Sequence, residues 1–115
     1  MDKILIKRKL GDHVREATTY YPVISVAGPR QAGKSTMLRE IFTGYDYISL
    51  EDPDMYALAS SDARGFFDTY KEGVIIDEAQ KVPDLFSFIQ TIVDKKRTPG
   101  RFVLSGSQNY LMHRN

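Results

Sequence analysis

The segment VISVAGPRQAGKST, residues 23–36, limits the fold of this chain more than any other. It opens with a run, VISVAG, whose apolar and β-branched residues predict a strand covered by helices on both faces. The run leads into a loop with the spacing Gly-x-x-x-x-Gly-Lys-[Ser/Thr], and the residues after it predict a helix that begins at Lys34. A strand, a glycine-rich loop and a helix in this order predict an α/β fold that holds a phosphate group at the helix N-terminus.

The rest of the chain continues the alternation of strand and helix. Short apolar runs predict three more strands, and stretches with helical spacing predict the helices between them. This alternation is typical of a three-layer fold, a parallel sheet with crossover helices, in which ligands bind at the carboxyl ends of the strands. We expect one domain, with a helical lead-in over residues 1–21 and a nucleotide-binding core over residues 22–115. The further strands are predicted over residues 45–50, 73–79 and 101–107, and the helices over residues 34–42, 53–61, 62–70 and 83–96.

The glycine-rich loop, which matches the Walker A pattern, is the predicted phosphate site. Gly28 and Gly33 can take backbone angles that are closed to other residues, so main-chain N–H groups can converge on an anion. Lys34 would reach the β- and γ-phosphates of ATP, and the Ser35 hydroxyl would bind Mg²⁺. Because Lys34 stands at a helix start, we expect it to be exposed, so that Lys34→Ala leaves the ligand-free fold intact. The predicted nucleotide-binding residues are Gly28, Pro29, Arg30, Gln31, Ala32, Gly33, Lys34, Ser35 and Thr36, of which Thr36 is the weaker candidate.

An acidic pair ends the predicted strand GVIIDEA. Asp77 can hold Mg²⁺ through a water molecule, which is the role of the Walker B acid in phosphate-loop enzymes. Glu78 can orient and deprotonate an attacking water molecule, a carboxylate role that hydrolysis of ATP needs and a small-molecule kinase does not. The alternative is a strand that simply ends in two solvated carboxylates.

The fourth predicted strand ends in SGSQN. A polar side chain between the loop and the acidic strand could detect the γ-phosphate and position the water molecule. Ser107 and Gln108 are the preferred candidates for this sensor role. Ser105 is a further candidate, with the alternative that it faces the core side of the strand end.

Composition excludes several classes of function. The chain has 115 residues and a net charge of +1, so no global field selects nucleic acid or an anionic membrane. It has no cysteine, which rules out a disulfide framework and suits a reducing compartment. No run approaches the roughly 20 apolar residues of a membrane span. We therefore expect a cytoplasmic protein with no membrane partner.

Three stretches together resemble a family of prokaryotic AAA-type P-loop ATPases: GPRQAGKST, VIIDEAQKVPDLFSFIQTIVD and RFVLSGSQNYLM. The resemblance covers residues 18–112, and the pairing of GPRQ with DEAQ and PDLF is specific within phosphate-loop proteins. It implies that Lys34 and Ser35 are the lysine and the metal ligand of the loop, that Asp77 and Glu78 form the second motif, and that SGS is the sensor region. It also implies that the fourth strand lies between the first and the third.

Members of that family continue beyond the point where this chain ends, with a fifth strand, a helical lid, catalytic arginines and a further domain of uncertain role. We therefore expect an N-terminal fragment with an incomplete sheet, in which neither Arg30 nor Arg114 stands at the place of a catalytic arginine. Such a fragment should bind nucleotide, turn it over very slowly, and self-associate through its open sheet edge. The expected partners are nucleotide, the C-terminal region of the same protein and a second copy of the chain.

The leading hypothesis for function is Mg²⁺-dependent binding of ATP and, in the complete protein, hydrolysis of ATP coupled to work on an unidentified partner. One alternative is a fragment of a helicase or translocase, because DEAQ resembles helicase acidic boxes, although the near-neutral charge argues against a nucleic-acid partner. A second alternative is a binding module in which nucleotide stabilises a platform without being hydrolysed. A third, a small-molecule kinase, would have no use for Glu78.

Overall fold

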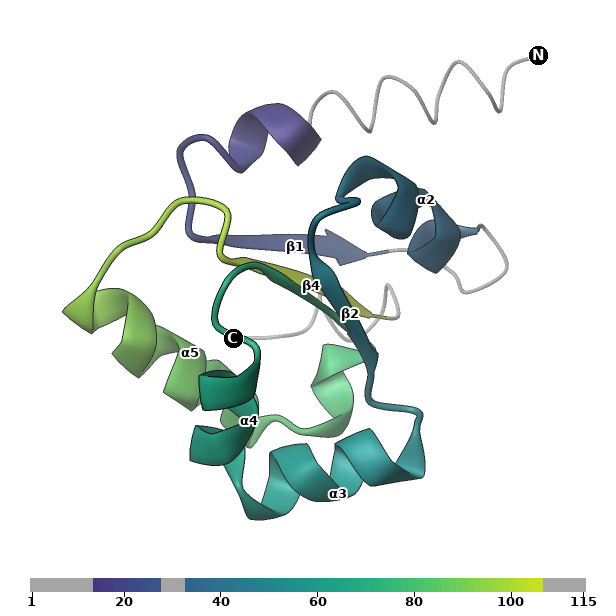
Figure 1. The fold of residues 1–115 in the computed structure, drawn as a ribbon, viewed down its shortest axis with the longest axis vertical. Coiled ribbons are helices and arrows are strands. Elements are labelled where there is room, and N and C mark those ends of the chain that lie inside the picture. The colour runs from purple at the N-terminus through teal and green to yellow at the C-terminus, as the bar shows by residue number, and fades with distance from the viewer. Residues whose placement is uncertain (1–13, 28–32, 107–115) are drawn as a thin grey trace.

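The computed structural model describes residues 14–27 and 33–106, and within them four strands form one sheet (Figure 1). All three strand pairs are parallel, and the order is β1-β4-β3-β2. The fourth strand therefore lies between the first and the third, which confirms the expected order and the α/β class. The strands are β1 (Val23–Ala27), β2 (Asp46–Ser49), β3 (Val74–Asp77) and β4 (Phe102–Gly106).

The helices begin where the sequence predicted, and capping residues mark two of these starts. The Asp52 side chain accepts a hydrogen bond from the Asp54 N–H, and Pro53 takes the first helical position, where its missing N–H costs nothing. The Asp62 side chain accepts from the Gly65 N–H and so begins the next helix. The helices are α2 (Lys34–Ile41), α3 (Pro53–Ser61), α4 (Ala63–Thr69) and α5 (Asp84–Lys95), with a 3-10 helix η2 (Ala79–Lys81) and a helical turn over residues 14–17.

The sheet separates two layers of helices (Figure 1). On one side, here called the α2 face, α2 and the helical turn over residues 14–17 pack on a core that includes Leu38 and Ile75. On the other side, the α5 face, α3, α4 and α5 cover a larger core that contains Phe66, Phe67 and Phe102. The rings of Phe67 and Phe102 meet edge to face with centroids 5.6 Å apart, an arrangement that the ring quadrupoles favour. The larger aromatic core therefore lies on the side opposite α2.

β1 differs from the other strands in how it is covered. Ile24 and Val26 are buried on the α2 face, whereas Ser25 and Ala27 on the opposite face are exposed. The core of the α5 face draws its buried strand residues from β2, β3 and β4, and β1 adds only Val23 at its margin. The expectation that helices cover both faces of this strand is therefore wrong for the described residues, because the helices of the α5 face pack against the other three strands.

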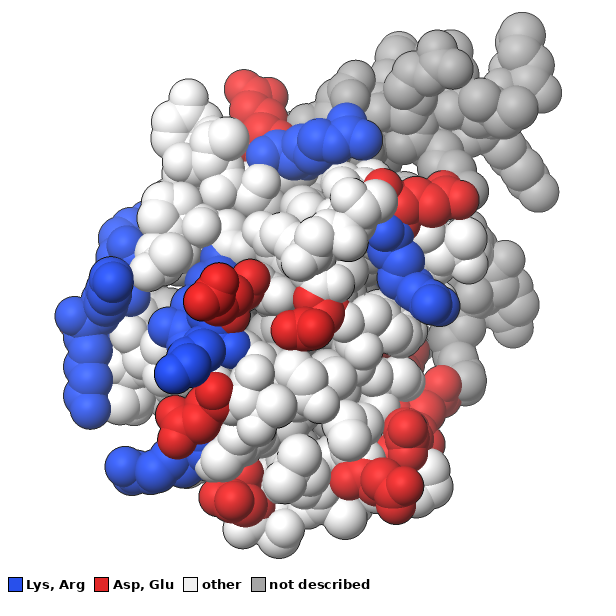
Figure 2. All heavy atoms as spheres, viewed as in Figure 1, with Lys and Arg blue, Asp and Glu red and all other residues white. Residues whose placement is uncertain are grey.

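Charged side chains of both signs share the surface of the molecule (Figure 2). In this view basic side chains crowd the side of α5, and acidic ones lie along the side of α3. This mixture agrees with the net charge of +1. Within the described ranges, no helix is both long enough and apolar enough to cross a lipid bilayer.

Candidate functional site

The carboxyl ends of three strands bring a row of polar side chains together. The strand register places Ser49 beside Asp77 and Asp77 beside Ser105. Side chains alternate between the faces of a sheet, and Ile75 and Val103, two residues earlier on their strands, are buried in the core of the α2 face. The three polar side chains of the row therefore point to the same face as α2.

Lys34 opens α2 directly after the glycine-rich loop. The preceding Gly33 has a φ of 73° and a ψ of 25°, a left-handed conformation that glycine takes at little cost. A Cβ at this position would meet no atom within 4 Å, so the backbone angle and not lack of space requires glycine. Lys34 is 6% exposed, and its Nζ donates a hydrogen bond of 2.7 Å to the Gly106 carbonyl. The expectation of an exposed lysine is therefore wrong, because the last carbonyl of β4 offers the ammonium group a partner beside the helix start.

Asp77 is held by hydrogen bonds from three segments. Its Oδ1 accepts from Ser105 Oγ at 2.6 Å and from the Glu78 N–H at 3.0 Å, and its Oδ2 accepts from the Tyr47 hydroxyl at 2.6 Å. Asp77 is 8% exposed and Ser105 is 1% exposed, so these bonds lie largely out of water. Ser105 thus contacts the acidic strand and orients its carboxylate, since hydrogen bonds to an ionised group are the stronger ones.

Tyr47, in β2, reaches across to β3 to bind Asp77. The Arg39 guanidinium carbon lies 4.8 Å from the centroid of the Tyr47 ring, which places a cation over the ring face. Burial raises the pKa of Tyr47 to about 12, together with the hydrogen bond to Asp77 and the negative charge of that carboxylate. The Ser35 hydroxyl and the Arg39 charge act on this pKa in the opposite direction. The phenol is therefore a hydrogen-bond donor at neutral pH.

Glu78 follows Asp77 in an unusual backbone conformation. Among the described residues, it is the one non-glycine residue with a positive φ, 55°. Such a left-handed conformation costs roughly 1–2 kcal/mol for a residue with a Cβ, and it is found disproportionately at functional sites. Glu78 is 4% exposed, and its Oε1 accepts a hydrogen bond of 2.6 Å from Gln80 Nε2. The turn from β3 into η2 therefore keeps a carboxylate at the end of the strand, and Gln80 fixes its direction.

Several of these side chains line one cavity of about 420 Å³ at the carboxyl end of the sheet. A lysine and a hydroxyl from the start of α2 face the acidic end of β3 across this space. Free N–H groups and the positive dipole end of a helix attract phosphate, and carboxylate and hydroxyl oxygens suit a hard cation. The cavity can therefore hold an anion and a cation side by side. Its lining residues are Lys34, Ser35, Tyr47, Ser49, Glu51, Asp77 and Glu78.

The structure brings together four of the residues predicted from sequence. Lys34, Ser35, Asp77 and Glu78 line the same cavity. Thr36 lies in the first turn of α2 with an exposed side chain and is absent from this lining among the described residues. The predicted loop residues Gly28, Pro29, Arg30, Gln31 and Ala32, the sensor candidates Ser107 and Gln108, and Arg114 lie outside the described residues.

Four further residues at the site were not predicted: Tyr47, Ser49 and Glu51 at the end of β2, and Gln80 in η2. For Tyr47 and Ser49 the sequence contained a signal that could have predicted their place at the site. In a parallel sheet β2 must end at the same edge as the acidic strand, and alternate residues on a strand share one face. The pattern YDYIS therefore places a tyrosine and a serine together at that edge. Glu51 and Gln80 stand beyond their strands, where the period of two no longer applies.

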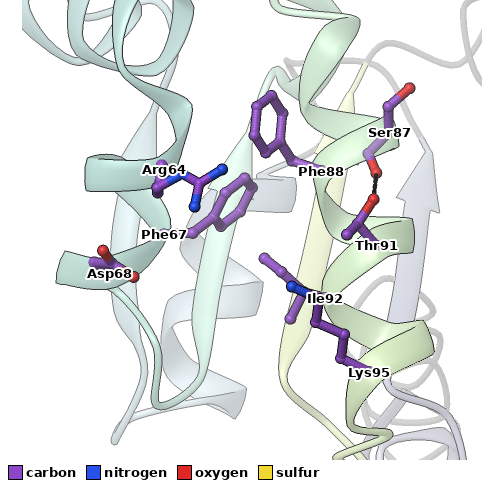
Figure 3. Close-up of a pocket in the computed structure, with 8 residues that line it drawn as sticks. All are labelled: Arg64, Phe67, Asp68, Ser87, Phe88, Thr91, Ile92 and Lys95. Atoms are coloured by element: carbon purple, nitrogen blue, oxygen red, sulfur yellow. Dashed lines mark hydrogen bonds between the residues drawn. The ribbon is translucent and has the colours of Figure 1, made fainter.

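A second hollow, of about 500 Å³, lies between α4 and α5 (Figure 3). Phe67 and Phe88 form its apolar wall, with ring centroids 6.4 Å apart. The Thr91 hydroxyl beside it donates to the Ser87 carbonyl at 3.1 Å, a bond within α5. Although this hollow is larger, its polar groups do not converge on one point as those at the strand ends do. The cavity at the strand ends is therefore the better candidate for a ligand site.

Comparison with known proteins agrees with this geometry. A family profile described as an AAA domain matches residues 20–115. Two curated proteins are similar to the chain: the uncharacterized protein Mb2031c of Mycobacterium bovis and the uncharacterized protein Rv2008c of Mycobacterium tuberculosis. Each is 33% identical to this chain over an alignment of 115 residues. The alignment covers 90% of this chain and 24% of the relative. The chain thus spans about a quarter of the length of these curated relatives.

Proposed function

Since this chain belongs to the AAA domain family, we propose that it binds ATP with Mg²⁺ at the carboxyl end of its sheet. The family is one of nucleotide-binding domains of the ATPase type, which gives the general function. One observation carries the finer proposal: a single cavity joins the start of α2, with Lys34 and Ser35, to the acidic end of β3, with Asp77 and Glu78. The loop residues 28–32 complete the phosphate site in this proposal.

Lys34 and the N-terminus of α2 would bind the phosphate groups. The first N–H groups of a helix have no partner within the helix, and the dipole places positive charge at the same end. Lys34 Nζ is already held beside this helix end by the Gly106 carbonyl. On binding, the ammonium group would exchange that carbonyl for the phosphate oxygens, and its charge would remain within the site.

The residues present fit a Mg²⁺ ion bound together with nucleotide. Mg²⁺ prefers oxygen ligands, keeps several water molecules, and is commonly held by one or two protein side chains and the phosphates of the substrate. The Ser35 hydroxyl and the Asp77 carboxylate line the same cavity. The part of the chain that the structure describes contains no cluster of three His, Cys, Asp or Glu side chains able to hold a metal alone. This donor set therefore suits an ion that shares its coordination with phosphate, and such an ion would neutralise the phosphate charge.

Glu78 is the proposed general base for hydrolysis. A carboxylate within hydrogen-bond reach of a water molecule can orient it and take its proton as it attacks the γ-phosphate. Glu78 lines the cavity beside Asp77, and Gln80 holds its Oε1 at 2.6 Å. The two acids would divide the work, Asp77 toward the metal and Glu78 toward the water molecule.

The activity of a protein of the relatives' length is a further part of the proposal. We propose that ATP hydrolysis there moves a C-terminal region or an attached partner, and that a second copy or a later segment supplies a catalytic arginine. Such an arginine is worth about 10³ to 10⁵ in rate in phosphate-loop enzymes. The 115-residue chain would then bind nucleotide and turn it over very slowly. The absence of cysteine suits a reducing compartment, and we propose the cytoplasm.

The test is the effect of Mg²⁺·ADP on the melting temperature of the chain. Ligand at 100 times its Kd adds about 2.7 kcal/mol to the free energy of unfolding. Lys34→Ala should remove most of this shift, because it deletes the charge that faces the phosphates. Lys34 is buried and bonded to Gly106, so the variant should also melt lower without ligand, and its shift is taken from its own ligand-free value.

Lys81→Ala is the matched control. Lys81 is an exposed lysine of η2, close in sequence to the acidic pair, and it is not part of the cavity lining. This variant should keep the full ADP shift. A shift in Lys34→Ala as large as that in the control would contradict the proposed site.

A further inference from the structure

Tyr47 links the two residues proposed to hold the metal ion. Its hydroxyl donates to Asp77 Oδ2 at 2.6 Å, and both Tyr47 and Ser35 line the cavity. Arg39, one turn after Ser35 on α2, places its guanidinium carbon 4.8 Å from the ring centroid. Tyr47 is therefore held by α2 on one side and holds the end of β3 on the other.

The hydrogen bonds of Asp77 decide how its carboxylate can meet an ion. An ionised carboxylate has about four acceptor positions, two on each oxygen. Oδ1 accepts from Ser105 Oγ and from the Glu78 N–H, which fills both of its positions. Oδ2 accepts from Tyr47 and, among the described residues, keeps one position. The carboxylate therefore offers a single acceptor to the cavity, on the oxygen that the phenol holds.

We propose that Tyr47 is a positioning residue for Mg²⁺: its phenol orients the Asp77 carboxylate so that Oδ2 can hold, through a water molecule, the ion that the Ser35 hydroxyl would bind. This inference rests on the proposed function, because it assigns a supporting residue to that same metal site. Tyr47 acts through Asp77 and needs no contact with nucleotide. Partners that orient metal ligands in this way typically contribute 10- to 100-fold in metal affinity.

The opposite role for the same contact would be competition with the metal. The phenol would then occupy the place of the ion and would have to leave before Mg²⁺ binds. The ring is held both by the Arg39 cation and by the bond to Asp77, which favours a fixed phenol over a mobile one. The two roles predict opposite effects when the hydroxyl is removed, so one substitution separates them.

The experiment measures ADP affinity of the 115-residue chain at increasing free Mg²⁺, by calorimetric titration, for wild type and Tyr47→Phe. We expect the Mg²⁺ concentration that gives half of the metal-dependent gain in affinity to rise 10- to 100-fold in Tyr47→Phe. ADP affinity in EDTA should stay within about twofold of wild type, because the phenol does not bind phosphate in this proposal. If Tyr47 had a purely structural role, Tyr47→Phe would lower the ADP affinity in Mg²⁺ and the ADP affinity in EDTA together.

Tyr45→Phe is the matched control. Tyr45 lies just before β2, its ring packs at the margin of the same α2-face core, and its hydroxyl donates to the Gly100 carbonyl at the opposite end of the sheet. It therefore loses a phenol hydrogen bond without touching Asp77, and its Mg²⁺ midpoint should equal that of wild type. Arg39→Met is a second variant that keeps the phenol and releases the ring, and it should raise the midpoint by a smaller factor. If Tyr47→Phe fails to fold, the Mg²⁺ midpoint of Arg39→Met tests the positioning role in its place.

The outcomes separate the inference from the proposed function. Wild-type protein that binds no ADP with or without Mg²⁺ would overturn the proposed function and the inference with it. Wild-type protein with Mg²⁺-dependent binding, together with an unchanged midpoint in Tyr47→Phe, would overturn the inference alone. A lower midpoint in that variant would also overturn it, since it would show that the phenol competes with the ion.

Discussion

The two ends of the sheet are built from different kinds of interaction. At the amino end, backbone groups close the structure: the Gly100 N–H donates to the Tyr21 carbonyl at 2.8 Å, and the Phe102 N–H donates to the Pro22 carbonyl at 2.9 Å. The Tyr45 hydroxyl adds a bond to the Gly100 carbonyl there. At the carboxyl end lie the buried polar and charged side chains of the described residues: Lys34, Asp77, Glu78 and Ser105.

The two ends differ in their effect on the stability of the fold: the amino end stabilises it, and the carboxyl end carries a cost. Neutral backbone pairs and apolar side chains stabilise the amino end, where the charged side chain of Arg101 is only half-buried although its Nε lies out of water. Buried charges carry a desolvation cost that their partners offset only in part, so groups of them are typical of functional sites. The strained backbone of Glu78 adds to that cost at the same end. Substitutions at the amino end should therefore affect stability first, and substitutions at the carboxyl end should affect ligand chemistry first.

The largest effect is expected from Phe102→Ala, at the start of β4. Phe102 is 0% exposed and meets Phe67 edge to face in the core of the α5 face. Loss of a buried phenylalanine side chain leaves a cavity and costs about 3–5 kcal/mol in the free energy of unfolding. Urea unfolding measures this loss, and any folded fraction should keep its affinity for ADP. A loss below 1 kcal/mol, or a specific loss of ADP binding, would contradict the division between the two ends.

The next effect concerns Glu78→Gln at the carboxyl end. The amide keeps the size of the side chain, so ADP affinity and melting temperature should stay close to wild type. If Glu78 is the general base, as proposed, its loss should lower ATP turnover by roughly 10²-fold or more. The turnover measurement needs a protein of the relatives' length, because this chain spans 24% of theirs. Unchanged turnover would show that another group activates the water molecule.

The smallest effect is a difference in alkaline stability between Tyr47→Phe and wild type. The pKa of Tyr47 is raised to about 12 from the unperturbed value of 10.0, so folding stabilises the protonated phenol. Its contribution is therefore complete below pH 10 and is lost as pH rises through about 12. Wild-type melting temperature should fall more steeply than that of Tyr47→Phe over this window, by a small amount because the side chain is only half-buried. Parallel curves would contradict the raised pKa of the phenol.

The architecture could be predicted because its signals are local. Two helix starts are marked by aspartates, Asp52 before Pro53 and Asp62 after the first short helix. Such capping signals do not depend on contacts with distant parts of the chain. The apolar run before Asp77 predicts a buried strand, and parallel topology then predicts that its end lies at the same edge of the sheet as the start of α2. The position of the site followed from these local signals together with the resemblance that gave the strand order.

The details of the site depend on contacts between distant segments. Lys34 folds onto the carbonyl of Gly106, 72 residues later, and no local pattern in the sequence carries that choice of side-chain direction. Tyr47 reaches Asp77 only because the register of β2 against β3 brings the phenol to the carboxylate. The positive φ of Glu78 also has no sequence signal, because glycine and asparagine are the residues that usually mark such a conformation.

The bond between Lys34 and Gly106 would affect how long a nucleotide stays bound at the proposed site. In the proposed site the ammonium group would give up the β4 carbonyl on binding phosphate and regain it when the nucleotide leaves, because Gly106 already offers this charge a partner. A hydrogen bond to a charged group is worth about 1.5–3 kcal/mol, which corresponds to roughly a 10- to 100-fold change in an equilibrium constant. Most such changes in affinity appear as faster dissociation. If the proposed site binds nucleotide, the carbonyl at the end of β4 would therefore shorten the residence time of the product and allow the site to reload.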